Sequence, residues 1–206
     1  MTEESSLEVY LSISQKKFGI YLLDKKNFKN IYKDELSIND YTDLIDYNLL
    51  NNFLDKNIFK IEKLIGNFLK SLIVIIENKQ ILSFSMGIKK QNYGEKINRH
   101  YLESSLAELK DLFKENYQNY KIIHFVVNRY LVDGVDCTSF DEQIDCDFMC
   151  VEVNFISAPN ILIKEISNVL EKYQIKVDCL FEKKYIKNLF QGELLDLSII
   201  AFKMQS

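Results

Sequence analysis

Hydrophobic and β-branched residues fall in short runs near the start of the chain. Residues 7–13 and 18–23 are two such runs with the polar stretch SQKK between them, and this arrangement predicts a β-hairpin. A third short strand is expected over residues 28–32. Apolar residues then recur at helical spacing and stop before Gly66, which predicts a long helix that ends there. The positions on its apolar face are Leu49, Leu50, Phe53, Leu54, Ile58, Ile61, Leu64 and Ile65.

Strand-like runs and helical patterns alternate along the remainder of the chain. Strands are expected over residues 68–76, 81–90, 121–127, 148–157 and 175–181. Asn98 is the expected N-cap of a helix whose apolar side carries Leu102, Leu106, Leu109 and Phe113. Pro159 is expected to open another helix. This mixed order predicts an α/β (α+β) fold.

Composition narrows the class of protein. The 206 residues carry a formal charge of -4, which provides no electrostatic footprint for nucleic acid. The longest apolar run, SLIVII, has the length of a strand and not the roughly 20 residues of a membrane span. The N-terminus is polar and acidic, so the four cysteines are expected to be reduced thiols in a cytoplasmic protein.

Several short motifs follow one another in a recognisable order. Glu62 and Gly66 stand at the end of a predicted helix, and Lys70 and Ser71 follow them near the start of the next predicted strand. A pattern H-x5-Y-x2-D-G is formed by His124, Tyr130, Asp133 and Gly134. The pair Ile97 and Asn98 lies between these two motifs, and the strand VEVNFISA follows them. Over about residues 7–189 this order resembles FtsA, a family of actin-like bacterial cell division proteins with an inserted subdomain called SHS2.

The resemblance implies a fold and a role. Residues 1–67 and 158–206 would form a partial actin-like (ribonuclease H-like) subdomain, and residues 68–157 the inserted SHS2 subdomain. The implied function is that of a protein-interaction adaptor at the divisome, with division proteins as partners. Strands left uncovered in a partial actin-like body would favour self-association. The chain would reach the inner face of the cell membrane through partners, without direct membrane insertion.

The family's first phosphate motif, Asp-x-Gly-Thr-x-Lys, is altered here. Ser12 and Ser14 replace its acidic residue and its glycine, and only Lys17 fits. Close approach to phosphates needs glycine and a magnesium site needs a carboxylate, so we expect no enzyme activity, no bound cofactor and no useful affinity for ATP. Two alternatives remain open: a diverged, split or truncated actin-like ATPase, and a pilus-assembly-type SHS2 module.

Other residues were weighed for chemistry. His124 lies in a strand without a motif for a nucleophile nearby, so it is interpreted as structural. The cysteines at 137, 146 and 150 lack the paired spacing of zinc sites, and we expect no metal site. Asp133 and Gly134 predict a turn. The acidic loop beyond it is the candidate partner-binding surface, through Asp136, Asp141, Glu142, Asp145 and Asp147.

Overall fold

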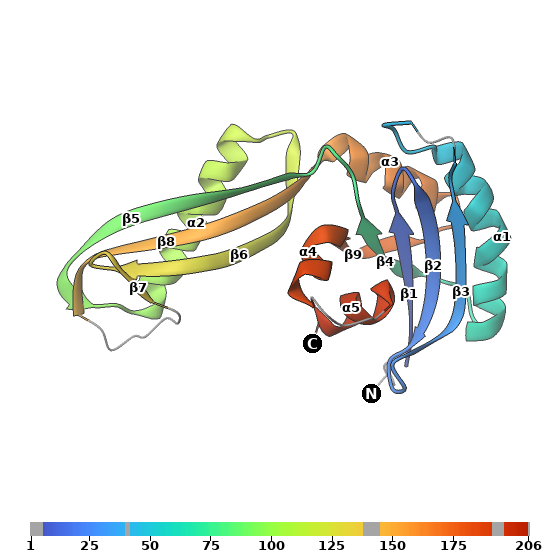
Figure 1. The fold of residues 1–206 in the computed structure, drawn as a ribbon, viewed down its shortest axis with the longest axis horizontal. Helices are drawn as coiled ribbons and strands as arrows, with labels where there is room; N and C mark the ends of the chain where they lie inside the picture. Colours follow the sequence, from blue (N-terminus) through green and yellow to red (C-terminus); the bar gives the residue numbers. More distant parts are fainter. Residues whose placement is uncertain (1–5, 40–41, 138–144, 191–195, 206) are drawn as a thin grey trace. The chain divides into compact units, whose positions relative to one another are not determined.

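The computed structural model describes residues 6–39, 42–137, 145–190 and 196–205. The chain folds into two compact units (Figure 1). Unit 1 contains Met1–Lys79 and Ile161–Ser206, and unit 2 contains Gln80–Asn160. The predicted start of the inserted part at residue 68 is too early, because the strand β4 (Ser71–Ile76) pairs within the sheet of unit 1.

Unit 1 is built on a sheet with the strand order β3-β2-β1-β4-β9. Its other strands are β1 (Leu7–Ile13), β2 (Lys17–Asp24), β3 (Lys29–Ser37) and β9 (Lys176–Glu182). The first three are antiparallel neighbours, as the predicted hairpin requires, whereas β1, β4 and β9 are parallel. Parallel neighbours need a crossover between them, and the connections from β1 to β4 and from β4 to β9 run through other elements.

Helices cover both faces of this sheet. On one face Phe18 of β2 contacts Phe53 of α1 (Tyr47–Ile65), with ring centroids 6.1 Å apart. Tyr173, just after α3 (Asn160–Glu171), donates a hydrogen bond to Asp55, so α3 lies beside α1. On the other face α4 (Lys183–Leu189) and α5 (Leu197–Lys203) pack through Ile186 and Ile200 (Figure 1).

The expectation of uncovered apolar strands is wrong for β1 and β2. Every residue from Phe18 to Leu23 of β2 other than Gly19 is at most 2% exposed. The cover on one face comes from α4 and α5, two helices that the sequence analysis did not predict. Uncovered strands are therefore no longer a reason to expect self-association through this part of the sheet.

Unit 2 is a four-stranded antiparallel sheet with one helix packed on it. The strand order is β5-β8-β6-β7, with β5 (Leu82–Lys96), β6 (Tyr120–Val132), β7 (Val135–Cys137) and β8 (Asp145–Pro159). Its core joins Leu109 and Phe113 of α2 (Arg99–Asn116) to Val151, Val153 and Phe155 of β8. The predicted cap is confirmed, because Asn98 accepts a hydrogen bond from the Tyr101 N–H at 2.8 Å.

The strands of unit 2 extend further than the apolar runs indicated. β6 reaches Val132 and ends in a tight turn in which Asp133 and Gly134 both have positive φ, 49° and 84°. The Asp133 carboxylate accepts hydrogen bonds from the N–H groups of Asp147 (3.1 Å) and Phe148 (2.8 Å). The predicted turn is confirmed, and its aspartate also fastens the start of β8. Among the described residues, no helix has the length and apolar character that crossing a membrane requires.

Candidate functional site

A small cavity lies in unit 1 at the carboxyl edge of the parallel strands, where β1, β4 and β9 end at Ile13, Ile76 and Glu182. Its volume is about 210 Å³. The lining residues are Ser12, Lys17, Gly19, Tyr21, Glu35, Lys183, Lys187, Asp196 and Leu197. Ligands of open α/β sheets usually bind beyond the carboxyl ends of the strands, so this cavity is the first candidate for a site.

The turn between β1 and β2 is closed by its own hydrogen bonds. The Ser14 N–H and the Ser14 hydroxyl both donate to the Lys17 carbonyl, each at 3.0 Å. The Lys17 N–H donates to the Ser14 Oγ, also at 3.0 Å. Loops that bind phosphate present unused backbone N–H groups to the anion. Here the N–H groups of Ser14 and Lys17 are occupied inside the turn, and Ser12 beside it is buried.

Charged side chains at the cavity neutralise one another. Lys17 lies 2.9 Å from the Glu35 carboxylate, and Tyr21 donates a hydrogen bond to Glu35 at 2.7 Å. Lys33 bridges Glu35 at 3.8 Å and Asp196 at 2.8 Å. Burial alone would raise the pKa of Glu35, but the hydrogen bonds from Lys17 and Tyr21 and the two lysine charges outweigh it, so this pKa is lowered. The Lys33 hydrogen bond is the main cause of the lowered Asp196 pKa.

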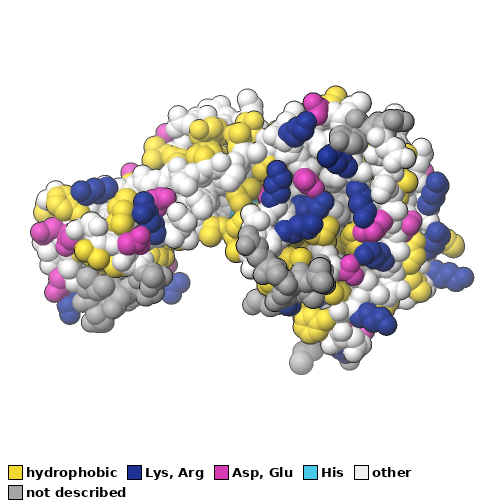
Figure 2. Space-filling model, in the orientation of Figure 1, with side chains coloured by type: hydrophobic (Ala, Val, Ile, Leu, Met, Phe, Trp, Pro, Cys, Tyr) yellow, Lys and Arg dark blue, Asp and Glu magenta, His cyan; other side chains and the backbone are white. Residues whose placement is uncertain are grey.

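A second ion pair connects β4 to α4 at the same edge. Lys183 lies 2.6 Å from Glu77, whose backbone N–H also donates to the Ile13 carbonyl of β1 at 2.9 Å. Burial raises the pKa of Glu77, but Lys183 and the nearby charges of Lys184 and Lys187 lower it overall. Figure 2 shows Lys and Arg side chains interspersed with Asp and Glu side chains over the face of unit 1 that carries α4 and α5.

Tyr21 narrows the cavity from the side of β2. A Cβ atom at Gly19 would lie 2.6 Å from the Tyr21 hydroxyl, so only glycine leaves room for this ring. Burial, followed by the hydrogen bond to Glu35, raises the pKa of Tyr21, and the phenol stays protonated at neutral pH. Pockets for cofactors commonly measure about 300 to 1,000 Å³. The cavity at the carboxyl edge is smaller than such pockets. Its carboxylates are paired with lysines, so neither Glu35 nor Asp196 is positioned as an unpaired general base.

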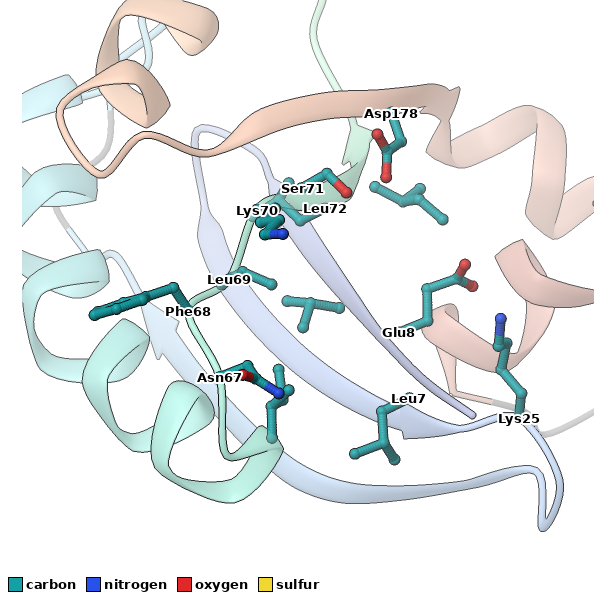
Figure 3. A pocket seen from close by; sticks show the side chains of 13 residues that line it. Leu7, Glu8, Lys25, Asn67, Phe68, Leu69, Lys70, Ser71, Leu72 and Asp178 are labelled. Carbon is teal, nitrogen blue, oxygen red and sulfur yellow. The ribbon is translucent and has the colours of Figure 1, made fainter. Parts of the chain in front are cut away.

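A larger groove opens at the opposite, amino edge of the same strands (Figure 3). Its volume is about 560 Å³. The walls are formed by Leu7, Glu8, Val9, Lys25, Ile65, Asn67, Phe68, Leu69, Lys70, Ser71, Leu72, Ile73 and Asp178. Phe68 points away from the other side chains of the groove and is 84% exposed. The lining of the groove combines apolar side chains with the charged side chains of Glu8, Lys25, Lys70 and Asp178, a composition that suits a binding surface.

The predicted partner-binding residues are only partly described. Asp141 and Glu142 lie outside the described residues. Asp136 faces Arg129 at 3.6 Å, and Asp145 and Asp147 are exposed at the start of β8. Three of the five acidic side chains therefore lie at one end of the unit 2 sheet, close to the Asp133–Gly134 turn.

The remaining candidates fit structural roles. His124 is buried, and burial lowers its pKa to about 4, which keeps the imidazole neutral near pH 7. Burial also raises the pKa of the Cys146 thiol, and a protonated thiol is a poor nucleophile. Across residues 6–39, 42–137, 145–190 and 196–205, no group of His, Cys, Asp and Glu side chains is arranged to hold a metal ion.

Sequence reasoning missed most of the residues around the carboxyl-edge cavity. It identified Ser12, Ser14 and Lys17 by their place in a motif. Glu35, Glu77 and Lys183 carried no motif, because they come from three separate elements that only the sheet order brings together. Position along the chain was one usable signal. Glu77 directly follows one predicted strand, and Lys183 comes just after the end of another. Functional side chains of α/β sheets gather beyond the carboxyl ends of the strands.

No family model and no curated protein matches the chain. Among solved structures, it is similar to a chain of the PilM-PilN type IV pilus biogenesis complex, with a TM-score of 0.54 and 8% identity. That alignment covers 88% of this chain and 49% of the other. The likeness shows the fold alone: the two chains share a mixed α/β fold, which is the class that the sequence predicted.

Two further solved structures are similar at lower TM-scores. The cytoplasmic domain of EpsL, an inner membrane component of the Vibrio cholerae type II secretion system, has 13% identity and a TM-score of 0.40, over 87% of this chain and 56% of that one. A Bacteroides thetaiotaomicron protein with an actin-like ATPase fold and unknown function has 14% identity and a TM-score of 0.39, over 94% and 59%. The chain thus spans about half the length of the solved chains it matches.

Proposed function

We propose that the chain is a non-catalytic, actin-like adaptor that binds other proteins of a multi-protein assembly. The observation that carries this proposal is the closed turn between β1 and β2. Its N–H groups at Ser14 and Lys17 are occupied within the turn, and Lys17 is paired with Glu35. A lysine held by a carboxylate is less available to a phosphate, and the occupied N–H groups of Ser14 and Lys17 cannot donate to one without breaking the bonds of the turn.

The assembly we favour is the cell division machinery at the inner face of the membrane. Support comes from the ordered motifs that resemble FtsA, among which Asp133 and Gly134 form the turn that such a motif would need. The proposed contact surface is the acidic end of unit 2, where Asp136, Asp145 and Asp147 are exposed, together with Asp141 and Glu142, which lie between them in the sequence.

A second candidate is a role in pilus assembly. It rests on the similarity to a chain of the PilM-PilN complex over 88% of this chain, a complex whose name describes partners in type IV pilus biogenesis. Both candidates place the chain among protein partners, and they differ in which partners those are.

Two measurements test the proposal. Phosphate release from Mg-ATP by the purified chain should not exceed that of the buffer, and steady turnover would show a diverged ATPase instead. Cross-linking in cells of the source organism should recover division proteins, and recovery should fall when Asp136, Asp145 and Asp147 are replaced by Asn. Recovery of pilus components in their place would favour the second candidate, and an undiminished yield with the Asn variant would remove the acidic end from the contact surface.

A further inference from the structure

The outward side of α1 carries a stripe of lysines bordered by apolar side chains, which we call the α1 stripe. It consists of Phe59, Lys63, Lys56, Lys60 and Leu64, in order around the helix. At 3.6 residues per turn these positions span about 140° of the helix surface. All five are exposed, and Phe59 and Leu64 are 74% and 51% exposed. The middle of the stripe faces away from the sheet, because the buried residues Leu50, Asn57 and Ile61 lie about 100° to 140° around the helix from Lys56.

Within the described part of the chain, the lysines of the stripe have no ion-pair partner. Lys56, Lys60 and Lys63 form no ion pair among the described residues. The two acidic residues of α1 are engaged elsewhere: Asp55 accepts a hydrogen bond from the Tyr173 hydroxyl at 2.7 Å, and Glu62 accepts one from the Leu69 N–H at 3.0 Å. The stripe is therefore a local concentration of positive charge on a chain whose net charge is -4.

Exposed apolar groups continue beyond the end of the helix. After Gly66 caps α1, the chain turns into Phe68, which is 84% exposed, and then Lys70, which is exposed and has no ion pair in the described part of the chain. Figure 2 shows Lys or Arg side chains beside hydrophobic ones along the right-hand edge of unit 1, where Figure 1 places α1. Moving an exposed Phe side chain out of water is favourable, so Phe68 can strengthen contact with a partner that offers an apolar layer.

We propose that the α1 stripe, with Phe68 and Lys70, binds the surface of a membrane that contains anionic phospholipids. Lysines next to exposed Phe and Leu suit the headgroup region, since the ammonium groups meet lipid phosphates while the rings and stems enter the boundary with the acyl chains. The five positions of the α1 stripe lie along a helix ridge, and Phe68 points away from the other side chains of the neighbouring groove, so this surface fits a deformable planar partner better than a peptide. This gives the chain a peripheral membrane contact of its own, beyond the adaptor role and beyond recruitment through partners.

Vesicle flotation of the full chain tests this proposal. Phosphatidylcholine vesicles with about 30% phosphatidylglycerol should bind the chain, and pure phosphatidylcholine vesicles should not. Raising the salt from about 0.1 M to about 0.5 M should release it, because the Debye length shortens. Each lysine near an anionic surface strengthens binding by about fivefold, so the triple variant Lys56→Gln, Lys60→Gln, Lys63→Gln should bind about a hundredfold more weakly. Phe68→Ser should weaken binding by several-fold without changing its salt dependence.

A charge-matched control separates the stripe from net charge. The triple variant Lys29→Gln, Lys96→Gln, Lys121→Gln also removes three exposed lysines that form no ion pair in the described ranges, and it should bind like the unaltered chain. Circular dichroism verifies that all variants are folded. Equal loss in both triple variants, equal binding to neutral vesicles, or no binding to either would overturn the proposal. Salt-sensitive binding to polyglutamate without binding to vesicles would also overturn it, in favour of an acidic protein partner.

Discussion

The two units bury their sheets in different ways. In unit 1 both faces of the sheet are covered, so β2 is buried continuously from Phe18 to Leu23. In unit 2 the helix α2 covers one face, and β5 alternates between half-buried and exposed residues from Leu82 to Gln91. Strands buried on both faces have nearly continuous apolar sequences, whereas strands with one solvated face alternate. The spacing of apolar residues along a strand therefore indicates whether one face or both faces of its sheet are covered.

The two cores also contain different residues. The cluster under α4 and α5 in unit 1 and the cluster under α2 in unit 2 share no member. Damage to one core should therefore loosen that unit first, and substitutions in each unit can be compared directly.

The largest expected effect is on the core of unit 2. Phe113 is 1% exposed and stacks on Phe155 with ring centroids 5.0 Å apart. Phe113→Ala should lower the free energy of unfolding by about 3 to 5 kcal/mol, because it leaves a large cavity. Urea unfolding measures the loss, and amide exchange should accelerate in Gln80–Asn160 before it does in β1 and β4. The neighbouring Leu112→Ala, at a site 36% exposed, should cost well under half as much.

A somewhat smaller effect is expected at the cover of unit 1. Ile200 of α5 is 4% exposed and packs in the cluster with Tyr10 and Tyr21. Ile200→Ala should cost about 2 to 4 kcal/mol and speed amide exchange in β1 and β2. Leu189→Ala, at a site 51% exposed, is the matched control. A loss of only a few tenths of a kcal/mol at Ile200 would mean that α5 does not cover this sheet. The sheet of unit 1 would then not differ from that of unit 2 in having both faces covered.

The helix caps provide a test of intermediate size. Asn98 caps α2 and Asp46 caps α1, and each side chain accepts a hydrogen bond from a backbone N–H in the first turn, at 2.8 and 2.9 Å. Asn98→Ala and Asp46→Ala should each cost about 1 kcal/mol. Protection of backbone amides from hydrogen exchange should fall in unit 2 for Asn98→Ala and in unit 1 for Asp46→Ala. Loss of protection in both units from either change would show that the units unfold together.

The smallest expected effect is on pH dependence in unit 1. Glu35 and Asp196 have pKa values lowered below their ordinary values of 4.5 and 3.8. A carboxyl whose pKa is lower in the folded state contributes stability above its unfolded pKa, and this contribution is lost as the pH falls through the folded value. The side chains of both ion pairs are partly exposed, so the effect should stay below about 1 kcal/mol. Glu35→Gln should flatten the decline in thermal midpoint between pH 5 and pH 3, and an unchanged slope would show that the pair with Lys17 adds nothing.

Local signals in the sequence predicted much of the fold. The run of apolar residues from Leu49 to Ile65 and the glycine after it gave α1 with its cap in the left-handed conformation. Asn98 and the Asp133–Gly134 turn were likewise predictable, because caps and turns depend on residues next to each other in the chain. The helices α4 and α5 were missed because each has only seven residues, too few for a helical period to stand out from a strand-like apolar run.

The candidate site was far less predictable than the fold. Lys17 was identified by its motif position, but its partner Glu35 comes from β3, whose alternating sequence resembles any exposed edge strand. The ion pair between Lys33 and Asp196 joins residues near opposite ends of the chain. The pair between Glu77 and Lys183 also joins residues far apart in the sequence. Such pairs depend on sheet order, which a single sequence does not reveal.

Binding of Mg-ATP, measured by isothermal titration calorimetry on the full chain, tests the central claim most directly. The closed turn at Ser14 and Lys17 and the paired Lys17, Lys33 and Lys183 predict no saturable heat of binding. Ser14→Gly removes the Oγ that accepts a hydrogen bond from the Lys17 N–H and so frees that N–H, while the backbone bond between Ser14 and Lys17 remains; it is the informative companion variant. Saturable binding to the unaltered chain with a micromolar dissociation constant would contradict the account and identify the chain as a nucleotide-binding actin-like protein.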